Sequence, residues 1–313
     1  MALAFLGGLA VAGQSSINGR LADRVGDAFF AAVVSFGGGL VVLLALLCVM
    51  PRMRSGVPRI RTALRDGTLH WWHLLGGLGG ATLVAGQAVT VAVLGVAMFT
   101  VGVVTGQTVS GLLVDRAGLG PAGPQAITPQ RLAGAVVMLI AVVITTGGGL
   151  TAVDGRVWLL VLPLLGGAAV AVQQAINGRV GVAAANPMTA TLVNFVVGTA
   201  ALLLGWAVSL MVQGGPGPLP SNPVLYTGGL IGVAFIALMA LVVRWTGVLV
   251  LGLATIAGQL SGSLVLDLVL PTRDAPVTLT TVLGVGLAMV AIAVTVFRRR
   301  PRVLPRPERT PVA

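Results

Sequence analysis

Charged residues are scarce in this sequence, and several residue types are almost missing. Of its 313 residues, 9% are charged, 4% are aromatic and one is a cysteine. All basic residues other than histidine are arginines, and Glu308 is the single glutamate. About a quarter of the residues of a soluble domain are charged, so this composition excludes an ordinary soluble protein. With 56% hydrophobic residues and a mean hydropathy of +1.01, the chain is expected to be an integral membrane protein.

Motifs for catalysis and for metal binding are missing as well. The sequence contains no phosphate-binding glycine loop, no Ser/His/Asp arrangement and no cluster of metal ligands. We therefore expect no enzyme activity, no direct ATP use, no cofactor and no metal site. Cys48 has no partner for an intrachain disulfide. The run His70-Trp71-Trp72-His73 is a poor metal site, and we interpret it as an aromatic anchor at the membrane interface.

Long uncharged stretches predict the membrane spans. A spanning helix needs roughly 20 apolar residues. The charge-free stretches are 1–19, 28–51, 67–114, 132–153, 157–178, 180–243, 245–266 and 275–297. Two of them are long enough for two spans each, which predicts ten helices. The proline-rich segment 214–223 cannot continue a helix, so it divides the stretch 180–243.

The tetrapeptide Ile-Asn-Gly-Arg occurs at 17–20 and again at 176–179, and it marks an internal repeat. Residues 14–39 align with 173–198 at an offset of 159, with nine of 26 positions identical. Residues 76–115 align with 228–267 at an offset of 152, with thirteen of 40 identical. The second alignment places Gly247, in a plausible loop, opposite Gly95. The stretch 67–114 is therefore predicted to hold two spans that turn near Gly95.

Each repeat then holds five predicted spans, and an odd number turns the second copy upside down in the membrane. We expect an all-α integral membrane protein with ten transmembrane helices arranged as two inverted five-helix repeats, residues 1–154 and 155–297. An Arg/Pro-rich cytoplasmic tail, residues 298–313, follows. Inverted repeats are typical of secondary transporters, whose two halves exchange conformations around a central site.

The positions of the arginines predict the orientation, because cytoplasmic loops retain an excess of basic residues. With both termini inside, fifteen arginines fall on the cytoplasmic side. The other side holds four, namely Arg20, Arg24, Arg156 and Arg273. The arginines of the tail are expected to lie against anionic lipid headgroups rather than to bind nucleic acid.

These features resemble the YdcZ-like family of the drug/metabolite transporter superfamily. The resemblance rests on Gln-x-x-x-Asn-Gly-Arg at 14–20 and 173–179, which closes a predicted span in each repeat, and on Ser35-Phe36 and Asn194-Phe195 in the span that follows each copy. It covers nearly the whole chain apart from the tail, and it implies a bacterial inner-membrane exporter of small molecules. Small multidrug relatives in the superfamily exchange protons for cationic drugs through a glutamate in the first helix. This chain has no glutamate there, so that mechanism is not carried over.

Polar side chains inside the predicted spans are the candidate cargo-binding groups, because polar groups in lipid are costly and tend to face the bundle interior. The symmetric set is Gln14, Asn18, Ser35, Gln107, Gln173, Asn177, Asn194 and Gln259. Amides donate and accept hydrogen bonds without net charge, which favours a neutral, zwitterionic or hydroxyl-bearing solute. The alternative is that these amides only join helices by hydrogen bonds.

Four charged residues at predicted helix ends suggest two gates. Arg20 and Asp267 are expected on the outer side, and Arg179 and Asp115 on the inner side. Each membrane face would then close with one ion pair, which in an apolar vestibule is stronger than an exposed pair. The alternative is that all four are solvated charges.

The sequence thus predicts a secondary transporter that exports a small polar or amphipathic metabolite or drug by alternating access. A passive channel or a non-transporting membrane subunit on the same scaffold is the alternative. The expected partners are a small-molecule substrate and membrane lipid, with no nucleic acid. Glycine pairs at 76/80, 102/106, 228/232 and 258/262 are expected to pack helices within one chain, and they leave a homodimer open.

Overall fold

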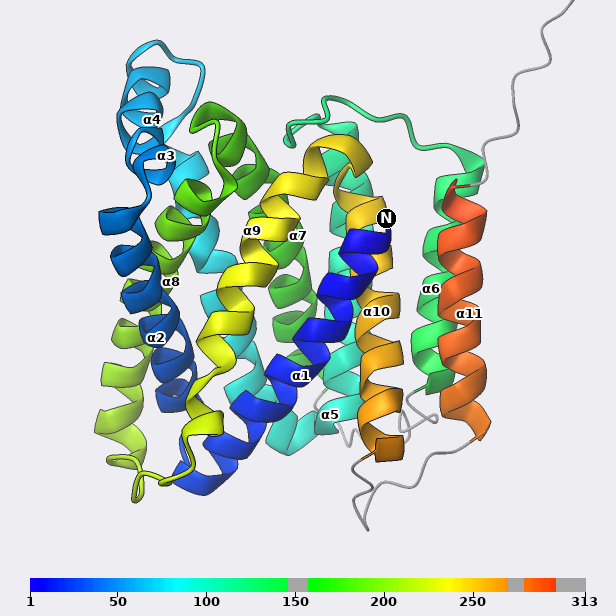
Figure 1. The fold of residues 1–313 in the computed structure, drawn as a ribbon. Coiled ribbons are helices and arrows are strands. Elements are labelled where there is room, and N and C mark those ends of the chain that lie inside the picture. The colour runs from blue at the N-terminus through cyan, green and yellow to red at the C-terminus, as the bar shows by residue number, and fades with distance from the viewer. Residues whose placement is uncertain (146–156, 270–278, 297–313) are drawn as a thin grey trace, which may run out of the picture.

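The computed structural model describes residues 1–145, 157–269 and 279–296, which form a bundle of helices joined by short connections (Figure 1). The long helices are α1 (Ala2–Val25), α2 (Ala28–Val49), α5 (Gly77–Arg116), α6 (Pro129–Thr145), α7 (Val161–Ala183), α8 (Pro187–Gln213), α9 (Gly228–Thr246), α10 (Val248–Val269) and α11 (Leu279–Val296). Shorter helical segments are α3 (Pro51–Arg54), α4 (Gly56–Arg65), η1 (Trp71–Gly76), η3 (Val157–Leu160) and η4 (Pro223–Tyr226).

Seven helices of the described part of the chain are long and apolar enough to cross a membrane. They are Ala28–Val49, Met98–Arg116, Trp158–Ala183, Pro187–Val212, Pro223–Thr246, Val248–Leu266 and Leu279–Val296. A shorter apolar helix is formed by Pro129–Thr145. Residues 214–222 are not helical, as their prolines predict. The helices α1 and α7 extend past the repeated tetrapeptide, so Arg20 and Arg179 lie inside the last turns of these helices rather than after them.

Helix α5 reverses direction along its length. It is helical over 40 residues, so the predicted turn near Gly95 is not a loop. Leu83 contacts Gly166 of α7, and Val103 contacts the neighbouring Gly167, although 20 residues of straight helix span roughly 30 Å. The helix is therefore bent into a first arm (residues 77–94) and a second arm (residues 98–116), which both lie against α7 (Figure 1). Helical hydrogen bonds satisfy the backbone in an apolar environment, which explains why the chain bends without a loop.

The charged segment between the predicted spans 28–51 and 67–114 is helical. Pro51 occupies the first turn of α3, where its missing N–H needs no partner. In α4, Ile60 is buried, and Ala63 and Leu64 pack on the same apolar cluster as Val180 of α7. The arginines of α4 are exposed. It is therefore an amphipathic helix that covers the end of α7.

Contacts between helices define their relative directions. Helix α1 runs parallel to α10, because Phe5 contacts Gly258 and Leu9 contacts Gly262. The second arm of α5 runs parallel to α7, because Gly106 contacts Leu164 and Ser110 Oγ donates to Ala168 O.

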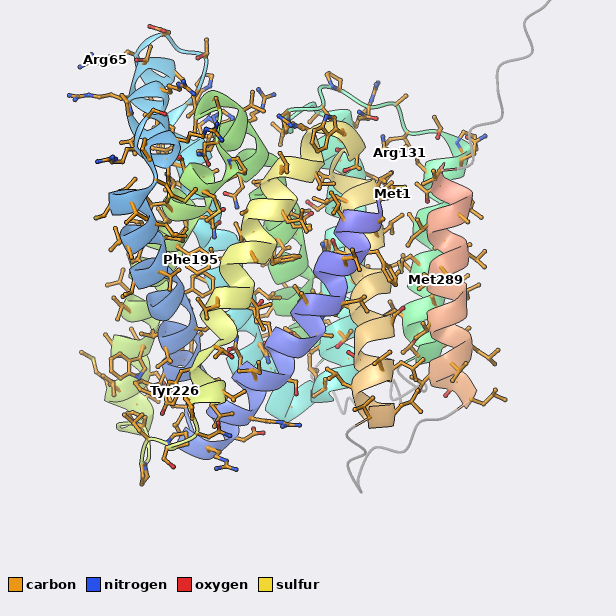
Figure 2. The ribbon with its side chains drawn as sticks, viewed as in Figure 1. Met1, Arg65, Arg131, Phe195, Tyr226 and Met289 are labelled. Carbon is orange, nitrogen blue, oxygen red and sulfur yellow. The ribbon has the colours of Figure 1, made fainter. Side chains whose placement is uncertain are left out.

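The second arm and α10 are antiparallel, since Gly111 contacts Leu249 and Gln107 contacts Gly252. Helices α1 and α7 therefore run in opposite directions. We call the end of the bundle that holds the last turn of α7 the Arg179 end, and the opposite end, which holds the last turn of α1, the Arg20 end. Arg65 and Arg131 lie at the Arg179 end, and Tyr226 lies at the Arg20 end (Figure 2).

The closest helix contacts occur in equivalent pairs. A methyl group added at Gly8 would collide with Thr255 O, and one added at Gly167 would collide with Val103 O. These residues correspond at the offsets of 159 and 152. The prediction that paired glycines pack helices within the chain is confirmed. A methyl group would lie within 3.1 Å of another helix at each of Gly76, Gly80, Gly102, Gly106, Gly228, Gly232, Gly258 and Gly262.

Candidate functional site

Polar groups of α1 and α2 meet against two glycines of α9. Asn18 Nδ2 donates a hydrogen bond to Ser35 Oγ over 3.3 Å. A methyl group added at Gly228 would collide with Asn18 Oδ1, and one added at Gly232 would lie 2.8 Å from Gln14 Nε2. The missing side chains of α9 therefore make room for the amides. We call Gln14, Asn18 and Ser35 the α1 amide cluster.

An equivalent arrangement joins α7, α8 and the start of α5. Asn177 Nδ2 donates a hydrogen bond to Asn194 Oδ1 over 2.8 Å. Gly76 lies against Asn177 Oδ1, and a methyl group added at Gly79 would lie 2.7 Å from Gln173 Oε1. We call Gln173, Asn177 and Asn194 the α7 amide cluster.

Two phenylalanines lie between the clusters. Phe36 of α2 and Phe195 of α8 stack with ring centroids 5.0 Å apart, and Phe195 lies near mid-height in the bundle (Figure 2). Phe195 approaches Gly232, which also faces Gln14, and Phe36 approaches Gly80, which is near Gln173. The sequence analysis used these rings only as family signatures. The two rings are equivalent at an offset of 159, and each directly follows a candidate polar residue. That pattern could have placed them in the candidate site.

Both clusters contain buried polar atoms with no hydrogen-bond partner among the described residues. These atoms are Asn18 Oδ1, Gln173 Oε1 and Asn194 Nδ2. A buried polar group without a partner destabilises the fold by about 1–3 kcal/mol. Two free acceptors and one free amide donor therefore suit a ligand, or water, that both donates and accepts hydrogen bonds.

Gln107 and Gln259 lie at other helix contacts. The buried side chain of Gln107 faces Gly252 of α10, and the backbone of Gln259 packs against Gly8 of α1. The structure thus brings the other six candidates into two clusters and places these two glutamines along the neighbouring helices.

Equivalent positions in α1 and α7 differ in exposure. Asn177 is 4% exposed, and a methyl group added at Gly178 would collide with α9 and approach Pro121. Asn18 is half-buried, Gly19 is exposed, and no described residue lies within 4 Å of a methyl group added at Gly19. The α7 amide cluster is therefore enclosed, whereas the α1 amide cluster is partly exposed at Asn18, although its Ser35 is buried.

Two further pairs of equivalent residues differ in the same way. Ser15 is exposed whereas Gln174 is buried, and Gln87 is exposed whereas Met239 is buried. The buried members lie toward the Arg179 end and the exposed members toward the Arg20 end. At these equivalent positions the side chains are therefore more closely packed toward the Arg179 end than toward the Arg20 end.

Asp115 pairs with Arg131 rather than with Arg179, which corrects the predicted inner ion pair. The Asp115 carboxylate also accepts hydrogen bonds from the N–H groups of Val248 and Leu249, over 2.7 and 3.0 Å. Asp115 is 2% exposed. It thereby joins the end of α5, the start of α6 and the start of α10, where a carboxylate also interacts favourably with the helix dipole. Arg131 of α6 was missed because the predicted pairs were chosen from residues that occur in both repeats, and Arg131 has no basic equivalent in the second repeat.

Arg179 closes the Arg179 end in another way. Its Nε donates to Leu119 O over 2.5 Å, and its Nη2 donates to Gly118 O over 2.6 Å. The guanidinium therefore fastens the last turn of α7 to the connection between α5 and α6. Its repeat equivalent Arg20 is exposed. The side chain of Asp267, the predicted partner of Arg20, lies outside the described residues.

The two histidines near the start of α5 hold a turn together. His73 Nδ1 accepts a hydrogen bond from the N–H of His70 over 2.9 Å, and the neighbouring Trp71 is 70% exposed. Burial lowers the pKa of the His73 imidazole, and the nearby Arg179 charge lowers it further. Within the described ranges, no group of three or more His, Cys, Asp or Glu side chains could hold a metal ion.

Comparison with known proteins adds a family and a fold. The family described as "Putative inner membrane exporter, YdcZ" matches residues 1–144 and again residues 158–294. A solved structure described as "Crystal structure of protein" has a TM-score of 0.66 to this chain at 18% identity, and the match covers 94% of each chain. At that identity the likeness concerns the fold alone. No curated protein matches the chain.

Proposed function

Because the chain belongs to the YdcZ family of inner membrane exporters, we propose that it is a secondary transporter that exports a small polar or amphipathic molecule. It would work by alternating access between two inverted five-helix repeats, residues 1–154 and 155–297. The unequal exposure of equivalent residues in α1 and α7 is the observation that carries this proposal.

Ten spans are reached if three further segments cross the membrane beside the seven apolar helices. These segments are α1, the first arm of α5 and α6. Helix α1 carries Gln14, Asn18 and Arg20 in its second half, which lowers its hydropathy. The contacts that bend α5 around α7 support two crossings within this helix.

The opposite directions of α1 and α7, and the family match to each half of the chain, support inverted repeats. An excess of arginine supports a cytoplasmic Arg179 end and cytoplasmic termini. The described arginines at the Arg179 end are Arg52, Arg54, Arg59, Arg61, Arg65, Arg116, Arg131, Arg179 and Arg244, while Arg20 and Arg24 lie at the other end.

Alternating access requires two states in which the repeats exchange their conformations. In the described state the α7 amide cluster is enclosed and Asn18 of the α1 amide cluster is partly exposed. An exchange would enclose Asn18 and expose Asn177. This structure then corresponds to the state that opens away from the cytoplasm. Arg179 acts as the closed gate and Arg20 as the open one, with Asp115 as a structural anchor for α10 instead of a gate partner.

The two amide clusters and the Phe36–Phe195 pair support a cargo with both polar and apolar surface. Unpaired amide atoms offer hydrogen bonds, and the rings offer an apolar contact. The predicted spans contain amide side chains and no glutamate, so a neutral or zwitterionic solute fits better than a bare cation.

Thiol labelling at equivalent positions tests the proposal. In a Cys48→Ser background, Ser15→Cys should react with an impermeant maleimide added outside the cell, and Gln174→Cys should not. A passive channel with a continuous pathway would let the external reagent reach both thiols, which would refute alternating access. Reconstituted protein should also show saturation and counterflow of its cargo, whereas a channel or a non-transporting subunit would show neither.

A further inference from the structure

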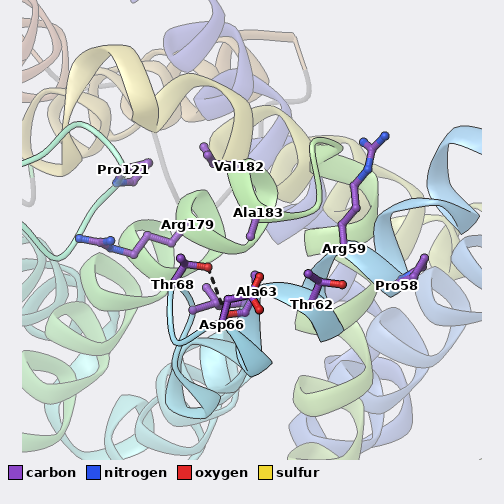
Figure 3. A pocket seen from close by; sticks show the side chains of 11 residues that line it. Pro58, Arg59, Thr62, Ala63, Asp66, Thr68, Pro121, Arg179, Val182 and Ala183 are labelled. Carbon is purple, nitrogen blue, oxygen red and sulfur yellow. Dashed lines mark hydrogen bonds between the residues drawn. The ribbon is translucent and has the colours of Figure 1, made fainter.

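A cleft opens at the Arg179 end between α4 and the last turns of α7 (Figure 3). Its volume is about 640 Å³, and its walls include Arg59, Thr62 and Asp66 of the α4 region together with Arg179 and Val182 of α7. The amide clusters contribute nothing to it, and the proposed transport cycle gives it no role.

Charged groups of both signs line this cleft. Arg59 and Arg179 stand toward opposite sides, and Asp66 lies between them (Figure 3). Arg179 uses Nε and Nη2 to hold the carbonyls of Leu119 and Gly118, which leaves Nη1 for another acceptor. The exposed Asp66 carboxylate has no hydrogen bond or ion pair to another described residue.

The other lining groups fit a site at the border between water and lipid. Thr62 is exposed and supplies a hydroxyl, and Val182 is 53% exposed and supplies an apolar edge. The apolar face of α4 packs on α7. Its polar side, with the cleft beside it, is therefore the surface that remains for a partner.

We propose that this cleft binds a phosphate group that carries an ammonium group, as in the phosphoethanolamine headgroup of a zwitterionic phospholipid. Arginine is the preferred side chain for phosphate oxygens, because its planar donors match their geometry. The Asp66 carboxylate between the arginines provides the partner for the ammonium group. The anionic lipid phosphatidylglycerol lacks that ammonium group and would leave Asp66 facing a phosphate.

Binding at this site would favour the closed Arg179 end. The ligand would contact α4 and also Arg179, the residue that fastens α7 to the connection between α5 and α6. This consequence rests on the proposed function, but the binding itself does not. A binding measurement that needs no transport therefore separates the failure of one from the failure of the other.

Native mass spectrometry of the purified full chain, with phosphatidylethanolamine, phosphatidylglycerol or phosphatidylcholine added to the detergent, tests the proposal. We expect phosphatidylethanolamine to be retained best. Arg59→Gln should reduce its retention about tenfold, because one charge-assisted hydrogen bond is lost. Asp66→Asn should remove the preference for phosphatidylethanolamine over phosphatidylglycerol. Arg61→Gln is the matched control, since Arg61 is an exposed arginine of the same helix outside the cleft.

Soluble phosphoethanolamine identifies the source of the headgroup. Displacement of the lipid by the soluble compound would show that the headgroup alone suffices, and retention of the lipid would assign the site to the intact phospholipid. Equal retention of all three lipids by the wild-type chain would overturn the proposal. An effect of Arg61→Gln as large as that of Arg59→Gln would overturn it as well.

Discussion

Amide side chains in a membrane bundle can bind cargo or join helices. Substitution should remove ligand binding in the first case and lower stability in the second. Asn18 donates one hydrogen bond to Ser35, and its Oδ1 has no partner among the described residues. The sequence placed Asn18 and Asn177 in the site through the repeated tetrapeptide. Their partners on α2 and α8 became clear only from the folded geometry.

Asn18→Ala should leave thermal stability almost unchanged, because an interhelical hydrogen bond in a membrane contributes about 0.6 kcal/mol on average. A thermal-shift screen of the wild-type protein against metabolites first identifies a stabilising ligand. If Asn18 binds cargo, the variant should lose that ligand's stabilisation. A large fall in melting temperature with the ligand shift retained would instead support the helix-joining role.

Asp115→Ala should destabilise the protein strongly. The change leaves the buried Arg131 without its ion-pair partner and removes the acceptor at the start of α10, and breaking a buried pair costs about 3–5 kcal/mol. Thermal unfolding in detergent measures the loss. The double variant Asp115→Ala/Arg131→Ala should recover part of it, because no unpaired charge remains. An unaltered melting temperature in the single variant would argue against the anchor role.

At the scale of elements, glycine determines where helices can touch. The glycines of α10 and the second arm of α5 allow backbone contact with α1 and α7, in pairs that follow the repeat. These contacts were predictable from glycine spacing. The bend of α5 was predicted from the alignment of Gly95 with Gly247, but its continuous helical backbone was not. Helix α4 was missed because its short apolar pattern has meaning only beside α7.

Gly258→Ala should destabilise the bundle by about 1–3 kcal/mol, the typical result of overpacking. The added methyl group would collide with Phe5 O of α1, and that backbone cannot move without shifting the helix. Gly37→Ala is the control, since no described residue lies within 4 Å of a methyl group added at Gly37 and alanine favours a helix over glycine. Melting temperatures of the two variants should move apart. Equal losses would contradict the packing argument.

At the scale of the whole molecule, the two halves share contacts but differ in conformation. Arg179 fastens the last turn of α7 to the connection between α5 and α6, whereas its repeat equivalent Arg20 is exposed on α1. Such a difference between equivalent segments is what a carrier resting in one of two states would display.

Arg179→Gln should loosen the closed end. The variant loses charged donors to the carbonyls of Gly118 and Leu119, so Gln174→Cys should react faster with a maleimide applied to inside-out membrane vesicles. We expect a change of about tenfold, since hydrogen bonds from charged groups contribute about 1.5–3 kcal/mol. Arg24→Gln, at the opposite end, serves as the control. An unchanged labelling rate would remove Arg179 from the gate.

The sequence by itself determined the helical membrane class, the internal repeat, the positions of the amides and the glycine contacts. These properties follow from composition and residue spacing, which are local properties of each segment and do not depend on its tertiary contacts. Tertiary structure alone decided that Asp115 pairs with Arg131, that Arg179 holds two carbonyls, and that Asn177 is buried while the equivalent Asn18 is half-buried. Because the two repeats have similar sequences, either one could adopt either conformation. Only the packing of all helices together determines which repeat adopts which conformation.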